Sequence, residues 1–224
     1  MTQTNLVLNQ PPAPWSERGP DGQRKEALKD TEDHTAARDA DAALLARYAA
    51  GDGAAARLLS ARLSPRAYAH AYRVLGDGAE AEDVTQEAML RLWKQAADWD
   101  DGRAQAATWI YRVVANLCTD RLRQRRTETL DEIDAPADPS PGAEARMQEG
   151  ARHDALQAAL LRLPERQRQA VVLRHIEGLA NPQIAEILDV GVEAVESLTA
   201  RGKKALTADL ASMRDALGYD DETV

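Results

Sequence analysis

The chain has 224 residues, a formal net charge of −9, 44% hydrophobic residues and no phenylalanine. The acidic charge excludes a protein that coats DNA indiscriminately, because such binding needs an excess of Lys and Arg. One cysteine excludes an internal disulfide, and no apolar run reaches the roughly 18 residues that a membrane-spanning helix needs. The N-terminus shows no pattern of a signal peptide. We therefore expect a cytoplasmic protein without membrane insertion, and the many alanines predict an all-α fold.

The helical patterns predict two small helical domains joined by an acidic flexible linker. Residues 1–38 are rich in proline, glycine and charged residues and lack apolar periodicity. The linker has seven acidic residues against one arginine, whereas residues 103–126 just before it have six basic residues against one acid. The expected segments are a tail at 1–38, an N-terminal domain at 39–126, the linker at 127–150, a C-terminal domain at 151–217 and a second tail at 218–224.

The N-terminal domain is expected to hold four helices. Helical patterning begins near Asp39, and Gly51 and Gly53 divide it. Pro65 is expected to mark a further helix start or a kink. Two more helices are expected, one from about Ala79 and one after Gly102.

The last of these helices shows the clearest period. One apolar stripe at i, i+3, i+4, i+7 and i+8 predicts a buried side made of Ile110, Val113, Val114, Leu117 and Cys118. Cys118 is therefore interpreted as a small core residue rather than a nucleophile. The opposite side carries Arg112, Asn116, Asp120 and Arg123.

The helix before it, near residues 79–95, also has two sides. Val84, Ala88 and Leu92 form an inward stripe, with Trp93 beside it. The polar residues left on the outward side are Asp83, Gln86, Glu87 and Arg91. By itself this is a charged amphipathic helix, and such a face is often only solvated.

Residues 181–198 of the C-terminal domain predict a helix-turn-helix. The buried offsets are expected to be filled by Ile184, Leu188, Val190, Val195 and Leu198, with Ala185 at the helix crossing. Asp189 stands at the turn position that often needs a left-handed residue. An ordinary buried helical hairpin is the alternative.

The second helix of this motif has an acidic outward side. The residues expected to point outward, together with the basic end that follows, are Val192, Glu193, Glu196, Ser197, Ala200, Arg201, Lys203 and Lys204. A carboxylate can accept a hydrogen bond from the cytosine amino group in the major groove, while Lys and Arg bind phosphates. A merely solvated face is the alternative for Glu193 and Glu196.

Two blocks of sequence resemble a known family. D-V-x-Q-E followed by L-W, and then T-W-I-Y-R-V-V-A-N-L-x-x-D-x-L-R-x-R-R, resembles region 2 of bacterial sigma factors. L-P-E-R-Q-R-Q-A-V-V-L-R-H-I-E-G-L with Q-I-A-E-I-L-D-V resembles region 4. The resemblance covers roughly residues 39–210 and is closest to the extracytoplasmic-function (ECF) class.

The resemblance implies roles for these faces. Binding to core RNA polymerase, at the β′ clamp, is implied for Asp83, Gln86, Glu87, Leu90, Arg91 and Trp93, and the β flap is a further implied contact. Opening of the −10 element of promoter DNA is implied for Trp109, Arg112, Asn116, Thr119, Asp120, Arg121, Arg123, Arg125 and Arg126. Core packing is the alternative for Trp109. The resemblance assigns the −35 element to the outward residues of the helix-turn-helix, but this chain has V-E-S-L where many members carry V-K-S-R. An anti-sigma factor is an implied partner.

Other classes of function fit less well. The resemblance predicts a factor that performs no catalysis itself and binds no metal or cofactor. His34, His70, His153 and His175 lack metal-ligand spacing, and His175 is interpreted as a packing residue. A sigma-like decoy that binds only an anti-sigma factor is the main alternative. A two-domain helix-turn-helix repressor would not explain the D-V-x-Q-E helix.

Overall fold

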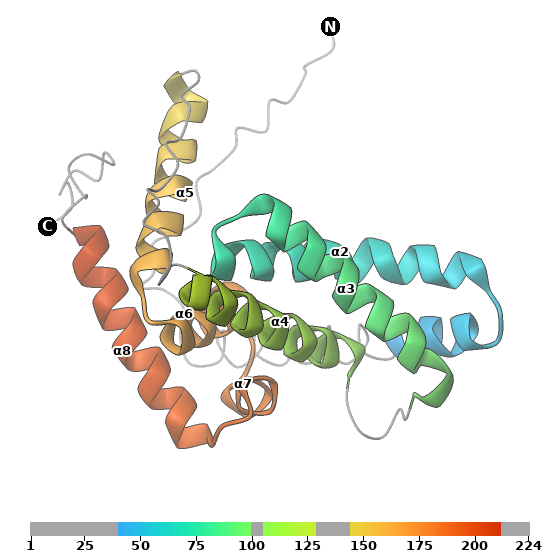
Figure 1. Cartoon of the computed structure of the whole chain (residues 1–224). Helices are drawn as coiled ribbons and strands as arrows, with labels where there is room; N and C mark the ends of the chain where they lie inside the picture. The colour runs from blue at the N-terminus through green and yellow to red at the C-terminus, as the bar shows by residue number, and fades with distance from the viewer. Residues whose placement is uncertain (1–39, 100–104, 129–143, 212–224) are drawn as a thin grey trace, which may run out of the picture. The chain divides into compact units, whose positions relative to one another are not determined.

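The structure is a computed structural model that describes residues 40–99, 105–128 and 144–211. All secondary structure in these ranges is helical (Figure 1), which confirms the all-α prediction. A helix at 40–49 is followed by α2 (Gly53–Leu75), α3 (Gly78–Gln95), the short 3-10 turn η2 (Ala96–Asp98) and α4 (Ala106–Glu128). Then come α5 (Glu144–Arg162), α6 (Glu165–Val171), the π-helical turn η3 (Val172–Ile176), α7 (Asn181–Leu188) and α8 (Val192–Ala211).

We call residues 40–128 the N-terminal half and residues 144–211 the C-terminal half. The expected tails and residues 129–143 of the expected linker lie outside the described residues. Helix α5 begins at Glu144, inside the segment expected to be linker.

Aspartates start two helices of the N-terminal half. The side chain of Asp52 accepts a hydrogen bond from the Ala54 N–H at 2.9 Å and caps α2. Asp77 caps α3 by accepting from the Glu80 N–H at 2.9 Å. These side chains bond N–H groups that have no partner inside a helix, which fixes where α2 and α3 begin.

Helix α2 runs through Pro65 without a break, so the prediction of a helix start there is wrong. Proline removes one backbone hydrogen bond from a helix interior. Here Pro65 is exposed while Leu63 and Ala67 on either side of it are fully buried. Burial of the apolar side of α2 outweighs the local loss of one hydrogen bond.

The predicted apolar stripes form the core of the N-terminal half. Val84, Ala88 and Leu92 of α3 are buried as expected. On α4, Ile110, Val114 and Cys118 are buried, and Val113 and Leu117 are half-buried. Burial raises the pKa of the Cys118 thiol to about 12, so the thiol stays protonated, in accord with a packing role.

Helix α4 also buries a second side that the sequence pattern did not predict. Tyr111 and Ala115 pack into one cluster with Leu173, Ile184 and Val195 of the C-terminal half. The apolar stripe predicted on α4 accounts only for its contact with α2 and α3. The second side shows that α4 lies against both halves of the chain (Figure 1).

His70 and His175 differ in burial. His70 on α2 is fully buried, and burial lowers its pKa to about 3, so its ring is neutral at physiological pH. Its ring meets the ring of Tyr111 edge-on, with centroids 5.7 Å apart. His175 is exposed, so its interpretation as a packing residue is wrong. Its position at the end of η3 turns the side chain outward next to the partly exposed Ile176.

Gly202 lies where α8 crosses α6. A Cβ atom on Gly202 would lie 2.6 Å from Val171 Cγ2 and 3.1 Å from the backbone oxygen of Gln167. We expect Gly202→Ala to lower the free energy of unfolding by about 1 kcal/mol, because overpacking of about 1–3 kcal/mol exceeds the gain in helix propensity. Urea unfolding measures this. Gly150→Ala in α5, with nothing within 4 Å, is the matched control and should stabilise the protein. Equal effects of the two changes would contradict the close crossing.

Candidate nucleic-acid and polymerase interface

The outward side of α4 is polar and lies along one line of the helix. Arg112, Asn116, Asp120 and Arg123 are all exposed, as the sequence predicted. Their spacing of three or four residues places them one above the other on the helix surface. This arrangement offers amide and carboxylate groups for hydrogen bonds together with cations for a phosphate backbone.

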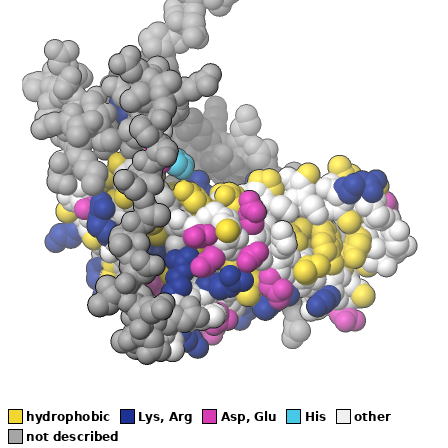
Figure 2. Space-filling model, turned by 45° about the horizontal axis from the view of Figure 1, so that its top comes forward, with side chains coloured by type: hydrophobic (Ala, Val, Ile, Leu, Met, Phe, Trp, Pro, Cys, Tyr) yellow, Lys and Arg dark blue, Asp and Glu magenta, His cyan; other side chains and the backbone are white. Residues whose placement is uncertain are grey.

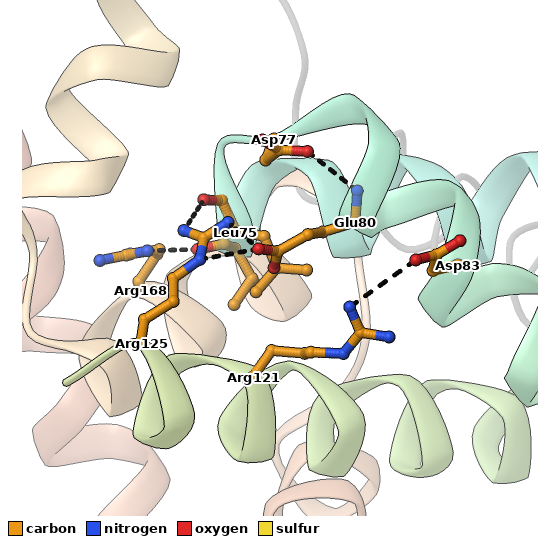
Figure 3. A network of polar contacts seen from close by, with 8 residues as sticks. Leu75, Asp77, Glu80, Asp83, Arg121, Arg125 and Arg168 are labelled. Atoms are coloured by element: carbon orange, nitrogen blue, oxygen red, sulfur yellow. Dashed lines mark hydrogen bonds and ion pairs between the residues drawn. The ribbon is translucent and has the colours of Figure 1, made fainter. Parts of the chain in front are cut away.

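Two of the arginines on α4 are held by acidic residues of α3 (Figure 3). Arg125 binds Glu80, with Nη2 2.8 Å from Oε1, and also donates to the Leu75 carbonyl at 3.1 Å. Arg121 lies 3.8 Å from Asp83. The family resemblance predicts that these arginines bind DNA. In the structure both arginines also join α4 to α3, and Arg125 joins α4 to the end of α2.

The remaining predicted residues of α4 differ in exposure. Arg126 is 76% exposed and lies 3.5 Å from Glu165 of α6. Trp109 is half-buried and packs edge-on against Trp99, with ring centroids 6.0 Å apart. Trp109 therefore contributes to the core of the N-terminal half and presents only part of its ring outward.

Thr119 faces the C-terminal half. Its hydroxyl accepts a hydrogen bond from Gln169 Nε2 at 3.1 Å. Thr119 and Asn116 line a small cavity of about 100 Å³, together with Arg166 and Leu188. No local sequence pattern predicts a role for Gln169, because its contact with Thr119 depends on tertiary packing.

Helix α3 presents a second polar side. The exposed residues are Asp83, Gln86, Glu87, Leu90 and Arg91. Arg91 and Glu87 form an ion pair at 2.9 Å, and Leu90 is a hydrophobic side chain with 54% exposure. Trp93 differs from this set, because it is half-buried against Tyr48 with centroids 4.8 Å apart.

A groove of about 460 Å³ runs beside this surface. Its walls come from α2 and α3 and include Pro65, Tyr68, Gln86 and Met89. In Figure 2 hydrophobic side chains gather in a cluster on the face shown, next to interspersed acidic and basic side chains. The exposed side of α3 combines acidic and basic residues with the apolar Leu90.

Helices α7 and α8 form the helix-turn-helix that the sequence predicted. Asp189 ends α7 in the left-handed conformation with φ 52°, as expected for the turn position. Ile184 and Val195 are buried, while Leu188, Val190 and Leu198 are half-buried. Ile187 is also buried, although the predicted pattern had not included it.

The outward side of α8 carries the residues named in the sequence analysis. All of them are exposed: Val192, Glu193, Glu196, Ser197, Ala200, Arg201, Lys203 and Lys204. Glu193 lies in the first turn of α8, where a carboxylate also stabilises the helix dipole. Arg201 donates to the Ser197 carbonyl one turn earlier at 3.2 Å.

The described residues show neither a metal site nor a membrane-spanning helix. Among the described residues, no group of three or more His, Cys, Asp or Glu side chains is placed to hold a metal ion. No helix in the described ranges is long and apolar enough to cross a membrane. A helix-turn-helix beside a second helical module with polar outward faces defines the class of helix-turn-helix DNA-binding proteins.

Comparison with known families makes this class specific. Residues 59–128 match the family model Sigma-70 region 2, and residues 153–206 match Sigma-70, region 4. The chain is 32% identical over 156 residues to the ECF RNA polymerase sigma factor SigW of Bacillus subtilis, covering 64% of this chain and 82% of SigW. SigM of Mycobacterium tuberculosis is 32% identical over 169 residues, covering 74% of this chain and 82% of SigM. The chain belongs to the ECF RNA polymerase sigma factors, a non-enzymatic family, and directs transcription initiation.

Solved structures agree with this assignment. The structure of CnrH in complex with the cytosolic domain of CnrY has a TM-score of 0.58 and 29% sequence identity, covering 77% of this chain and 98% of CnrH. RpoE of Bartonella quintana, solved with the anti-sigma factor NepR, has a TM-score of 0.56 at 19% identity and shows the shared fold.

Proposed function

We propose that α3 binds core RNA polymerase, that α4 opens the −10 element and that α8 contacts the −35 element. The observation that carries this proposal is the line of exposed polar residues on α4, which has both hydrogen-bonding groups and cations. Single-stranded DNA is captured by such a combination of backbone cations and groups that bind an unstacked base. In this proposal Arg112 and Arg123 bind phosphates, and Asn116, Thr119 and Asp120 contact bases.

The polymerase-binding surface is proposed to consist of the exposed residues of α3. Asp83, Gln86, Glu87 and Arg91 supply polar contacts, and Leu90 supplies an apolar contact at their centre. The β′ clamp is the proposed partner of this surface, and the β flap is the proposed partner of the C-terminal half. Trp93 supports the surface from below through its contact with Tyr48.

We infer that the chain is also controlled by a protein partner of the anti-sigma kind. The CnrH and RpoE structures described above are complexes, in the second case with a protein named as an anti-sigma factor. A partner that covers the outward faces of α3 or α4 would withhold this chain from polymerase or from promoter DNA.

The test of the promoter function uses core RNA polymerase and fragmented genomic DNA. Transcripts made with the purified chain are sequenced from their 5′ ends. Discrete starts that share two upstream elements at a fixed spacing would support the proposal. Absence of specific starts together with absence of core binding would contradict it and favour a decoy that binds only an anti-sigma factor.

The carboxylates of α8 give a sharper prediction within this function. We expect Glu196→Ala to change base preference within the −35 element at positions where cytosine is favoured, by about fivefold or more, because a carboxylate accepts from the cytosine amino group. Sequencing starts from a randomised −35 library measures this preference.

Two comparisons distinguish recognition of bases by Glu196 from a general effect of its negative charge. Asp209→Ala removes a partly exposed acidic residue near the far end of α8 and should leave the preference unchanged, although it breaks an ion pair with Arg162. A uniform rise in transcription from all −35 sequences with Glu196→Ala would show that Glu196 only repels phosphates.

A further inference from the structure

Glu177 joins three elements of the two halves. The Tyr111 hydroxyl on α4 donates to Glu177 Oε2 at 2.6 Å, and Arg73 Nη1 on α2 donates to Oε1 at 3.2 Å. The side chain of Glu177 is only 11% exposed, and that of Arg73 is 23% exposed. A carboxylate with two donors in such a sheltered position is strongly held, because water competes weakly for it.

The surroundings of Tyr111 favour this arrangement. Burial and the nearby Glu177 carboxylate raise the pKa of Tyr111, so its hydroxyl stays protonated and remains a donor. His70 lies edge-on to the Tyr111 ring and is neutral, so it adds no charge next to Arg73. Arg66 is the other charged group whose field reaches Tyr111.

The end of α2 forms a second attachment between the halves. Its last carbonyl groups have no partner within the helix. Gln157 of α5 donates to the Tyr72 carbonyl at 3.1 Å, and Arg168 of α6 donates to the Val74 carbonyl. The C-terminal half therefore caps a helix of the N-terminal half.

A third attachment lies on the proposed −10 surface. Gln169 donates to Thr119, and the cavity beside this bond is bounded by residues of both halves, including Asn116 and Arg166. At about 100 Å³ this cavity is smaller than most small-molecule sites, which are about 300 Å³ or more. The outward side of α8 has no such cover from the N-terminal half, since its polar residues are exposed.

We propose that these contacts form an intramolecular lock, with Glu177 at its centre, that holds the two halves together and engages Thr119 of the −10 surface of α4. In the locked chain the outward side of α8 stays accessible, and Arg112 and Arg123 of α4 stay exposed. The lock comprises Glu177 with Arg73 and Tyr111, and the bond from Gln169 to Thr119. The inference rests on the proposed role of α4 in −10 binding. Opening the lock separates the halves, frees Thr119 and makes the chain competent for promoter opening. The apparent affinity for a ligand that needs the open form falls in proportion to the fraction of open molecules.

A thiol-labelling experiment tests the lock without DNA. Ala115→Cys places a thiol in the cluster shared by the two halves, at a position that is 2% exposed. The native Cys118, one turn away, lies in the core of the N-terminal half and reports any unfolding of that half. We expect the added Glu177→Ala change to raise the labelling rate of the thiol at position 115 at least tenfold and to leave Cys118 protected.

Two further variants make the result specific. Asp209→Ala breaks the ion pair with Arg162, which lies within the C-terminal half, and should leave labelling at position 115 unchanged. Tyr111→Phe removes only the hydroxyl and should raise labelling a few-fold with retention of the fold. Labelling at position 115 that is equally fast with and without Glu177 would overturn the lock. A joint rise at positions 115 and 118 would also overturn it, because that pattern indicates unfolding.

A transcription assay distinguishes failure of the lock from failure of the proposed promoter function. With core polymerase and genomic fragments, Glu177→Ala should reach half-maximal transcription at a several-fold lower concentration than the unchanged chain. If labelling shows opening but neither protein gives specific starts, the proposed function fails and the lock stands. If specific starts appear at equal concentrations of both proteins although Glu177→Ala opens the chain, the proposed restraint on α4 is wrong.

Discussion

Replacing Arg168 by methionine is expected to lower the free energy of unfolding by about 3 kcal/mol or more. The guanidinium of Arg168 is buried and donates to three backbone carbonyls: Val74 at the end of α2, Leu161 at 2.8 Å and Leu163 at 3.1 Å. Burial lowers the pKa of Arg168, yet the side chain remains a cation placed at the negative ends of two helices. Methionine keeps much of the side-chain volume and removes all of these donors.

The loss is large because the carbonyls at the end of a helix have no hydrogen-bond partner within that helix. Each buried acceptor without a partner costs about 1–3 kcal/mol, and water can reach only part of this site. Arg168→Lys should recover part of the loss, since an ammonium group keeps the charge but cannot span three carbonyls with one planar fork. Urea unfolding followed by circular dichroism measures both variants.

Arg166→Met is the matched control for this prediction. Arg166 lies two residues away on α6 and is exposed. Its replacement should change the free energy of unfolding by less than about 0.5 kcal/mol, as is usual for surface positions. Similar losses at 166 and 168 would show that the loss at 168 does not arise from the network around the end of α2 (Figure 3).

Sequence periodicity predicted the helices and their main buried sides because each depends on neighbours along the chain. The stripe that includes Ile110 and Val114 follows from the helical repeat alone. The left-handed conformation of Asp189 was predicted for a similar reason, since the turn of a helix-turn-helix fixes the local backbone. The exposed residues of α8 were predicted by the same repeat.

Contacts between distant segments do not follow from local helical periodicity. Tyr111 looked like one more aromatic residue in a helix, yet it belongs to a cluster with residues of α7 and α8 and binds Glu177. Arg121 and Arg125 looked like DNA-binding cations, and their pairing with Asp83 and Glu80 depends on how α3 and α4 pack. A basic residue in a helix has the same local pattern whether it meets phosphate or a carboxylate of the same protein.

Leu90→Asp is expected to weaken binding to core RNA polymerase by about 30-fold or more, equivalent to about 2 kcal/mol. Leu90 is 54% exposed at the centre of the outward side of α3, so its replacement removes little from the core. In the proposed complex this leucine becomes buried among polar contacts, and an aspartate there would have to lose its water without a partner. The new charge would also lie close to the carboxylates of Asp83 and Glu87.

Leu58→Asp on α2 provides a closely matched control, because Leu58 is 52% exposed and the chemical change is the same. Titration of fluorescently labelled chain with core polymerase, followed by anisotropy, gives both affinities. Circular dichroism melts verify that both variants fold. Retention of core binding by Leu58→Asp and its loss by Leu90→Asp would assign the surface to α3. Equal losses would instead indicate a general response to added negative charge, and full binding by both would move the polymerase contact away from α3.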